Sequence, residues 1–250
     1  MQGKTFSLLG RRSYRISDNV SVNIPTVGMV RGENEEDETD FWQEVGLFTT
    51  SSYDMVIELD DMGLDFTKTS DYTVFLIQFL LWRDDKLKNN VPDLLFNEFN
   101  LWELQVSEAN GETVFVDENG DVVIDENAYN RLSELLTYVT GHEKPKRIKY
   151  DDYLRKQYVE DCRESRERRK KRKKENDRSG GALDGIILRL VCNANFPYDF
   201  ETVNNVTLFD LIYALKQIEK DNSVTDLMQS RLVGADLKKI PKERFSRFVL

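Results

Sequence analysis

The sequence predicts a mainly α protein with a small β component, an α+β fold whose C-terminal unit is helical. Apolar residues recur at helical spacing through most of the 250 residues, while two shorter stretches alternate polar and apolar residues as strands do. The chain is 40% hydrophobic, which supplies enough apolar surface for a large core.

The first expected element is a short β-structure before Pro25. Polar and apolar residues alternate here, as in a strand with one buried face. The apolar positions are Tyr14, Ile16, Val20, Val22 and Ile24. Pro25 ends the pattern, because it has no amide to donate to a strand ladder.

Three helices are then expected in the first half of the chain. The first two lie between residues 40 and 63, and the hydroxyls of the intervening TTSS sequence at 49–52 would cap the second, which ends at Gly63. Ser70 would cap the third helix. Its sequence, DYTVFLIQFLLW, is apolar on nearly all sides, which predicts a central buried helix.

A β-hairpin is expected near residues 112–126. β-branched residues flank Asn119-Gly120 there, and this pair supplies the positive φ angles of a tight hairpin turn. Helical spacing returns directly afterwards and stops at Gly141. The apolar stripe of this helix consists of Tyr129, Leu132, Leu135, Leu136 and Val139.

From Pro145 the sequence predicts a long charged helix that ends in a hinge. Its apolar positions are Tyr150, Tyr153, Leu154, Tyr158 and Cys162. They stop at Cys162, so the first part of the helix is expected to pack on the protein and the second part to project into solvent. The Ser-Gly-Gly sequence at 179–181 terminates the helix and supplies the hinge.

The C-terminal part of the chain is expected to contain three helices. The first is apolar, Thr207 caps the second and Ser223 caps the third, each cap being followed by an aspartate three positions later. The predicted organisation is therefore an N-terminal α+β domain at 1–144, a charged helix and hinge connector at 145–181, and a helical domain at 182–250.

Positive charge is concentrated in one basic run of the connector. Its cations are Arg163, Arg166, Arg168, Arg169, Lys170, Lys171, Arg172, Lys173 and Lys174. Outside residues 163–174 the chain has 26 basic and 43 acidic residues, a formal net charge of −17. A helix would distribute these cations around all its sides, and no aromatic residue accompanies them, so a solvent-exposed connector is the favoured interpretation. Contact of the run with phosphate or with an acidic partner remains open.

The sequence predicts a cytoplasmic protein. Its longest apolar stretch is far shorter than the ~20 residues that cross a bilayer. The N-terminus lacks the sustained apolar segment of a signal peptide. The two cysteines, Cys162 and Cys192, lack the spacing of a metal or redox motif and are expected to be reduced.

No catalytic, metal or cofactor site is expected. His142 is the only histidine, and its place after a helix end favours a solvated charge over a general base. A magnesium site at Asp60, Asp61 and Asp65 would lack a second acidic cluster. Neither a phosphate-binding glycine loop nor a nucleophile elbow is present. The sequence therefore predicts a protein that is not an enzyme and needs no cofactor.

The order of segments resembles the tail assembly chaperones encoded in the tail-morphogenesis region of tailed bacteriophages. The resemblance lies in the stretches ISDNVSVNIPTVGMV, ELDDMGLDFTKTSDYTVFLIQFL, VFVDENGDVVIDENAYNRLSELL and NFPYDFETVNNVTLFDLIYALKQIEKDNSVTDLMQSRLVGADLKKI. It implies a non-enzymatic protein that coats the helical tape-measure protein and keeps it soluble while tail-tube subunits polymerise around it. The implied partners are phage tail proteins, in particular the tape measure and the tail tube, or further copies of the chain.

Phe196, Tyr198 and Phe200 are the candidates for a surface that binds a protein partner. They are dense for a loop, and exposed aromatics beside helices suit a helical partner. The competing interpretation is that they pack back on their own helices. Two other functions also remain open: a virion structural subunit of the tail or connector, and a nucleic-acid-binding protein acting through residues 163–174.

Overall fold

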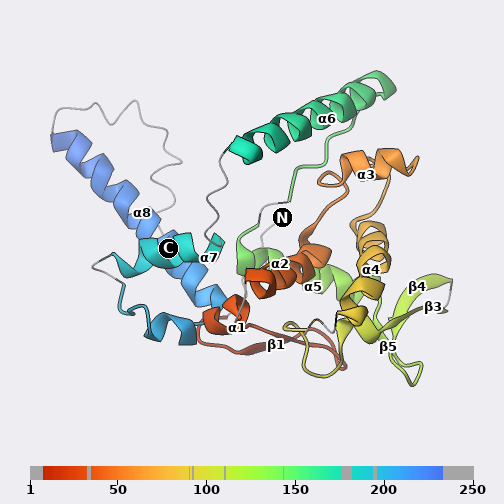
Figure 1. Cartoon of the computed structure of the whole chain (residues 1–250), viewed down its shortest axis with the longest axis horizontal. Helices are drawn as coiled ribbons and strands as arrows, with labels where there is room; N and C mark the ends of the chain where they lie inside the picture. The colour runs from red at the N-terminus through yellow and green to blue at the C-terminus, as the bar shows by residue number, and fades with distance from the viewer. Residues whose placement is uncertain are drawn as a thin grey trace.

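The computed structural model confirms a mainly α fold with a small β component. It describes residues 8–32, 35–89, 91, 93–109, 111–142, 144–175, 182–193 and 196–232; among these, residues 35–36, 171–175, 182 and 223–232 are described by their backbone only. About 55% of the chain is helical. The described part contains eight α-helices and five strands, the strands forming two antiparallel sheets (Figure 1).

The predicted β-structure before Pro25 is confirmed as a hairpin followed by a short helix. These elements are β1 (Ser13–Arg15), β2 (Ser21–Asn23) and α1 (Val27–Arg31). The strands pair antiparallel, with Tyr14 opposite Val22. Thr26 caps α1, since its hydroxyl accepts a hydrogen bond from the Met29 amide. The alternation in the sequence therefore turns the apolar residues of β2 toward the core.

Three helices enclose the central core. They are α2 (Glu35–Thr49), α4 (Asp71–Lys88) and α5 (Glu126–Thr140). Phe75 of α4 is fully buried, and its ring centroid lies 5.0 Å from those of Phe48 in α2 and Tyr129 in α5. Tilted and stacked aromatic pairs of this kind add to the free energy gained by burying the rings. The largest side chains of the core thus meet where the three helices converge.

The prediction that α4 is buried on nearly all sides is wrong. Ser70 caps the helix as expected, with its hydroxyl accepting from the Thr73 amide. Leu80 and Leu81, however, are 57% and 59% exposed. The elements that pack on α4, namely α2, α5 and the 3-10 helix η1 (Leu101–Glu103), leave this side uncovered. An apolar surface therefore remains in the middle of α4.

The predicted hydroxyl cap of the second helix is also wrong. That helix is α3 (Val56–Asp61), and no side-chain hydrogen bond caps its start. Within the TTSS sequence, the amide and the hydroxyl of Ser51 both donate to the Asp54 carboxylate, which forms a tight turn ahead of the helix. The expected end of the helix is confirmed, since Gly63 follows it with a φ of 74°.

The predicted hairpin near 112–126 is confirmed, and the structure adds a third strand. The strands are β3 (Gln105–Ala109), β4 (Glu112–Val116) and β5 (Val122–Ile124). Gly120 adopts a φ of 83° in the turn, and its amide donates to the carbonyl of Asp117. The sequence does not predict β3, because four of its five side chains are exposed and show no apolar alternation.

The charged helix α6 (Asp152–Glu175) begins later than predicted, since residues 144–151 form neither helix nor strand. Asp151 marks the start, because its carboxylate accepts from the Leu154 amide at 2.8 Å. At ~1.5 Å per residue the helix is about 36 Å long. The hinge predicted at 179–181 lies outside the described residues.

The C-terminal elements follow the prediction up to one helix. They are α7 (Ala182–Val191), the 3-10 helix η2 (Thr202–Asn205) and α8 (Leu208–Leu232). Thr207 caps α8 as expected, accepting from the Asp210 amide and donating to the Asp210 carboxylate. The separate helix predicted from Ser223 is wrong. α8 passes through this position unbroken, because no glycine or proline interrupts it.

The N-terminal and C-terminal parts share one apolar core. Buried residues of α7 and α8 belong to the same cluster as those of α1, α2 and α5. Backbone hydrogen bonds of 2.9 Å join the parts, from the Val27 amide to the Val206 carbonyl and from the Leu208 amide to the Pro25 carbonyl. The chain on either side of the predicted boundary near Gly180 therefore contributes to a common core.

Candidate protein-binding site

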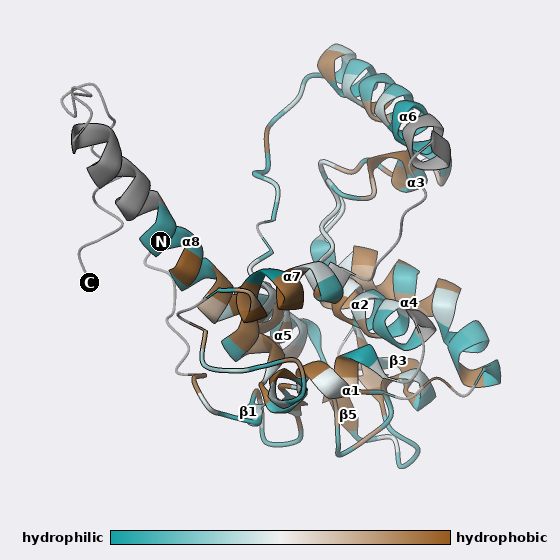
Figure 2. Ribbon diagram, turned by 60° about the vertical axis from the view of Figure 1, so that its left-hand side comes forward, coloured by the Kyte–Doolittle hydropathy of each residue, from teal (hydrophilic) through white to brown (hydrophobic). Residues whose placement is uncertain are grey.

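α3 and α6 lie side by side and project from the rest of the molecule (Figures 1 and 2). We call residues 53–68 and 144–175 the arm, and the other described residues the body. Among the described elements, α3 is the one against which α6 packs most extensively. Figure 2 shows α6 largely in the teal of hydrophilic residues. α6 is therefore held mainly through one of its sides.

The arm packs on an apolar cluster that is distinct from the main core of the body. Its buried members are Tyr53, Met55, Val56, Leu59, Phe66, Val74 and Val159, and Ile77, Tyr150, Tyr158 and Cys162 are partly buried against them. Val74 and Ile77 belong to α4, so the body also contributes to this cluster. The ring centroid of Phe66 lies 5.3 Å from that of Tyr53 and 5.7 Å from that of Tyr158. Among the described side chains of α6, Val159 alone is buried. The helix thus contributes one full anchor and a few partial ones.

Exposed ion pairs border this cluster. Arg163 donates to the carboxylates of Asp60, at 2.9 Å, and Asp61, and Arg166 donates to Glu58 at 2.7 Å. The five side chains are between 37% and 59% exposed. Solvent therefore screens these pairs strongly, and each adds little to stability. They favour one orientation of α6 on α3 and contribute little to the strength with which α6 is held there.

Asp65 forms a less exposed contact between the arm segments. Its carboxylate accepts from the Arg155 guanidinium and, at 2.7 Å, from the Thr67 hydroxyl. Desolvation would raise the pKa of Asp65, but the hydrogen bonds from Thr67 and the charge of Arg155 outweigh it, so this pKa lies below its ordinary value. The carboxylate is therefore ionised when Arg155 is bound.

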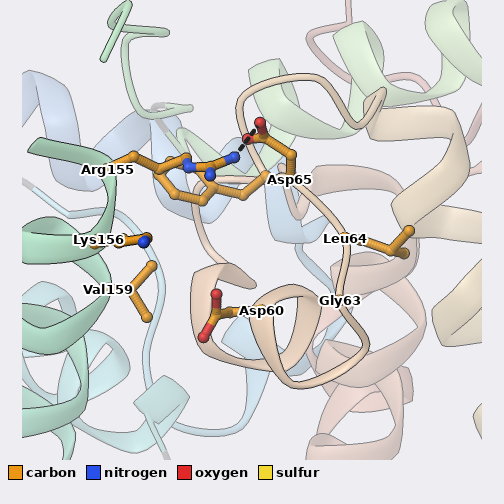
Figure 3. Close-up of a pocket in the computed structure, with 8 residues that line it drawn as sticks. Asp60, Gly63, Leu64, Asp65, Arg155, Lys156 and Val159 are labelled. Atoms are coloured by element: carbon orange, nitrogen blue, oxygen red, sulfur yellow. Dashed lines mark hydrogen bonds and ion pairs between the residues drawn. The ribbon is translucent and has the colours of Figure 1, made fainter. Parts of the chain in front are cut away.

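A pocket of about 160 Å³ remains open between α3 and α6 (Figure 3). Its lining residues are Asp60, Gly63, Leu64, Asp65, Phe66, Arg155, Lys156 and Val159. Figure 3 shows Arg155 and Lys156 on one wall, with Asp60 and Asp65 on the opposite wall. Lys156 has no ion-pair partner among the described residues. The interface between the two helices is thus incompletely filled and lined by charges of both signs.

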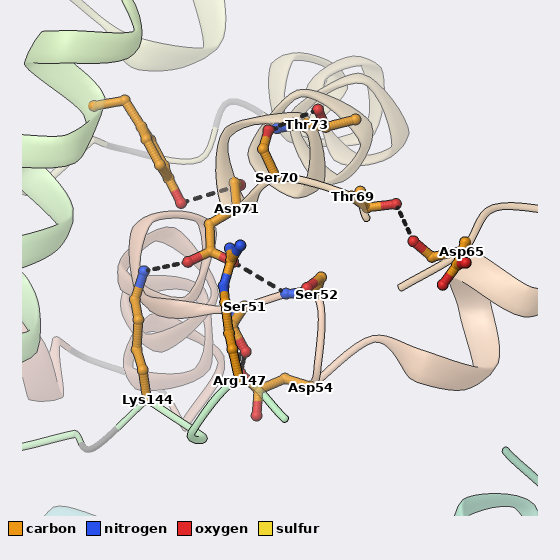
Figure 4. Close-up of polar contacts among 11 residues, drawn as sticks. Ser51, Ser52, Asp54, Asp65, Thr69, Ser70, Asp71, Thr73, Lys144 and Arg147 are labelled. Atoms are coloured by element: carbon orange, nitrogen blue, oxygen red, sulfur yellow. Dashed lines mark hydrogen bonds and ion pairs between the residues drawn. The ribbon is translucent and has the colours of Figure 1, made fainter. Parts of the chain in front are cut away.

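Asp71, in the first turn of α4, ties the segment before α6 to the body (Figure 4). Its carboxylate accepts from Lys144 at 3.2 Å, from Arg147 at 2.9 Å and from the Ser52 amide at 3.3 Å. Burial would raise the pKa of Asp71, but Lys144 and Arg147 lower it below its ordinary value. This one carboxylate therefore holds two separate loops at the base of the arm.

The three predicted partner-binding aromatics do not share one environment. Phe196 is buried, whereas Tyr198 and Phe200 are 43% and 56% exposed. They lie in the connection between α7 and α8, where the Phe196 and Tyr198 rings meet with centroids 5.4 Å apart. Phe196 thus packs on the protein, and the other two present aromatic surface to solvent.

The structure divides the basic run into two parts. Arg163 and Arg166 contact α3, as described above. Arg168 and Lys170 lie in exposed pairs with Glu164 and Glu167 of the same helix. Arg169 is exposed. The side chains of Lys171, Arg172, Lys173 and Lys174 lie outside the described residues. Several cations of the basic run are therefore already paired with carboxylates of the protein itself.

The residues considered for catalysis are not brought together. His142 is exposed beside the end of α5. Asp60 and Asp61 face Arg163, and Asp65 faces Arg155. In the part of the chain that the structure describes, no group of three His, Cys, Asp or Glu side chains is arranged to hold a metal ion. Cys162 and Cys192 are both free thiols.

Sequence reasoning missed the arm contacts of Asp65, Asp71 and Arg155. A partial signal exists, because the acidic stretch at 54–65 and the basic stretch at 144–156 are complementary in charge. Opposite charge alone does not identify which residues pair, however, because many aspartates and lysines of this chain could attract one another. The pairing depends on how the two segments are placed by the body.

Comparisons with protein-family models, with curated proteins and with solved structures gave no match to this chain. None of the helices described has the length and apolar character needed to span a membrane.

Proposed function

We propose that this protein is a non-enzymatic assembly factor of a tailed bacteriophage, which acts as a chaperone by binding the helical tape-measure protein in the host cytoplasm during tail morphogenesis. The order of its sequence segments supports this role through the resemblance described above. The observation that carries the binding role is the apolar surface on α4, where the neighbouring leucines Leu80 and Leu81 are 57% and 59% exposed.

The physical requirement for such a chaperone is an apolar surface that accepts a helix. A long coiled-coil protein presents a continuous apolar stripe, which aggregates unless another surface covers it. Single exposed leucines are common on proteins, but two adjacent ones on a helix offer a larger apolar contact. The exposed rings of Tyr198 and Phe200 form a separate apolar contact in the connection between α7 and α8. An amphipathic helix binds such contacts through residues at intervals of three and four.

The test is co-expression of the chain with the genes that neighbour it, followed by purification and mass spectrometry. We expect a long helical protein to co-elute, without nucleic acid, at both 50 and about 200 mM salt, because apolar contacts depend little on ionic strength while phosphate contacts weaken steeply. The combined variant Leu80→Asp and Leu81→Asp should lose the partner. The matched control is Asp84→Ala on the same helix, which should retain it.

Other outcomes assign other functions. Nucleic acid that leaves at high salt, with no protein partner, would make residues 163–174 the functional site. Stoichiometric incorporation into finished particles would instead identify a structural subunit of the virion. Retention of the partner by the Leu80→Asp and Leu81→Asp variant would show that this side of α4 is not the binding surface.

A further inference from the structure

α6 rests on a surface that has the features of a helix-binding face. We call the apolar residues Tyr53, Val56, Leu59 and Phe66, together with the acidic residues beside them, the α6-binding face. Those acidic residues are Glu58, Asp60, Asp61 and Asp65. Apolar anchors with charged residues at the border are the arrangement by which proteins bind amphipathic helices.

The acidic border is costly for α3 itself. Asp60 and Asp61 occupy the last turn of α3, where the helix dipole disfavours negative charge. Arg163 compensates for them only while α6 is in place. Because the two aspartates do not stabilise α3, their contribution here is to attract a basic helix.

The fit of α6 on this face is incomplete. Val159 is its one buried anchor among the described side chains, and the pocket of about 160 Å³ stays open next to it. For comparison, an apolar cavity of about 150 Å³ is large enough to hold benzene. The face therefore has room for one more large side chain than α6 supplies.

α6 is attached by few buried contacts. Its ion pairs with Glu58 and Asp60 are exposed and screened, and the pair between Arg155 and Asp65 is the less exposed exception. The body core does not include any α6 residue. Lifting α6 away would expose Phe66 and its neighbours without opening the core of the body.

We infer that α6 covers a docking site, and that a basic amphipathic helix of the protein partner displaces α6 and binds the α6-binding face. This inference rests on the proposed protein-binding function and adds a second contact, for a basic helix of the partner, to the apolar contact at Leu80 and Leu81. We expect the partner helix to have the same pattern as α6. In α6 the apolar residues are Tyr158, Val159 and Cys162, and arginines lie one turn before and one turn after them. The free protein holds α6 on the face, and the partner helix fills the open pocket with an additional anchor.

Cys162 reports directly on the position of α6. Burial raises the pKa of its thiol, and the side chain packs against the arm cluster. Cys192 is exposed, so the variant Cys192→Ser leaves Cys162 as the single thiol. In that variant, labelling of Cys162 with a thiol reagent should be slow and should follow the population of molecules in which α6 has lifted.

The experiment adds a synthetic peptide of residues 150–167, carrying Cys162→Ser, to the full-length Cys192→Ser protein. We expect the peptide to bind saturably and to accelerate Cys162 labelling by about tenfold, because it competes with α6 for the face. A peptide of scrambled sequence should do neither. Asp60→Lys with Asp61→Lys should abolish peptide binding, and Arg168→Ala with Arg169→Ala, which changes exposed cations outside the contact, should leave labelling unchanged.

Three results would overturn the inference. The first is that the peptide leaves the labelling rate of Cys162 unchanged at saturating concentration. The second is that the protein forms dimers by exchanging α6 between copies, which would assign the α6-binding face to a second copy of the chain. The third is that the Asp60→Lys and Asp61→Lys variant still retains the co-purified partner. In the third case the proposed function is unaffected, and only the assignment of the α6-binding face as a docking site is wrong. If no protein partner co-purifies with the natural protein, by contrast, the proposed function is wrong. The result of the peptide experiment does not depend on that outcome.

Discussion

The body and the arm bury similar residue types in different ways. In the body, Phe75 meets the rings of Phe48, Phe115 and Tyr129 with centroids 4.9 to 5.0 Å apart, so the core is closed from several directions. In the arm, one helix lies on a small aromatic cluster bordered by exposed ion pairs. The comparison shows that a helix can be well formed and still be weakly attached.

Phe75→Ala should destabilise the whole protein. Removing a fully buried ring from the body core leaves a cavity bounded by other rings, and we expect a loss of about 3–5 kcal/mol. Urea unfolding followed by circular dichroism measures the loss. A loss below about 1 kcal/mol would mean that the core of the body repacks freely, against the contrast drawn here.

Phe66→Ala should act on the arm alone. The same truncation removes the central ring of the arm cluster, and we expect the opening of α6 to become easier by up to about 3 kcal/mol. Hydrogen exchange should accelerate in α3 and α6, while α2 and α5 keep their protection. Equal acceleration in all four helices would show that arm and body unfold as one unit.

Asp71→Asn should loosen the base of the arm by about 1–2 kcal/mol, since two cations lose their charged partner. The folded-state pKa of Asp71 is lowered, so its stabilising effect is present above the ordinary value of about 3.9 and is lost as the pH falls through the folded pKa. The difference between the variant and the natural protein should therefore be full at pH 7 and shrink as the pH falls below about 3.9. A difference that stays constant as the pH falls further below about 3.9 would contradict an ionic origin.

Glu44→Gln should have the opposite pH dependence. Burial, together with neighbouring Asp93, raises the pKa of Glu44 well above its ordinary value. The stability linked to this group is thus complete below the ordinary pKa of about 4.3 and is lost as the pH rises through the folded pKa. We expect the variant to be more stable than the natural protein by on the order of 1 kcal/mol at pH 8, and the difference to fall toward zero as the pH is lowered to about 4. Denaturant titrations at both values decide this.

Arg169→Ala should leave the arm unchanged. The side chain is exposed and lies beyond the residues of α6 that contact α3. Thermal unfolding and hydrogen exchange of α6 should match those of the natural protein. Faster exchange in α6 would extend the contact surface past Arg166 and weaken the distinction between the two halves of the helix.

Local patterns were sufficient to predict elements whose ends are determined by neighbouring residues. α5 begins where the Asp125 carboxylate accepts from the Ala128 amide and ends where Gly141 adopts a φ of 68°. Both signals are local, because a cap needs only the adjacent turn. The hairpin around Gly120 was predictable for the same reason.

The candidate site was not predictable in the same way. The basic run was recognised from its composition, but nothing in the run shows that Arg163 and Arg166 contact Asp60 and Glu58, about a hundred residues earlier. The exposed surface of α4 was missed as well. The sequence of α4 has apolar residues on every side. Which of them remain exposed depends on which other elements of the fold pack against the helix.

Short stretches of sequence are enough to predict the mainly α character, the helix caps at Ser70 and Thr207, and the hairpin turn at Gly120, because each depends on the conformation of a few consecutive residues. The packing of distant segments determines that Leu80 and Leu81 face solvent, that α7 and α8 join the core of the body, and that α6 lies on α3. These outcomes depend on which surfaces meet, and helical spacing specifies the faces of a helix without specifying what covers them.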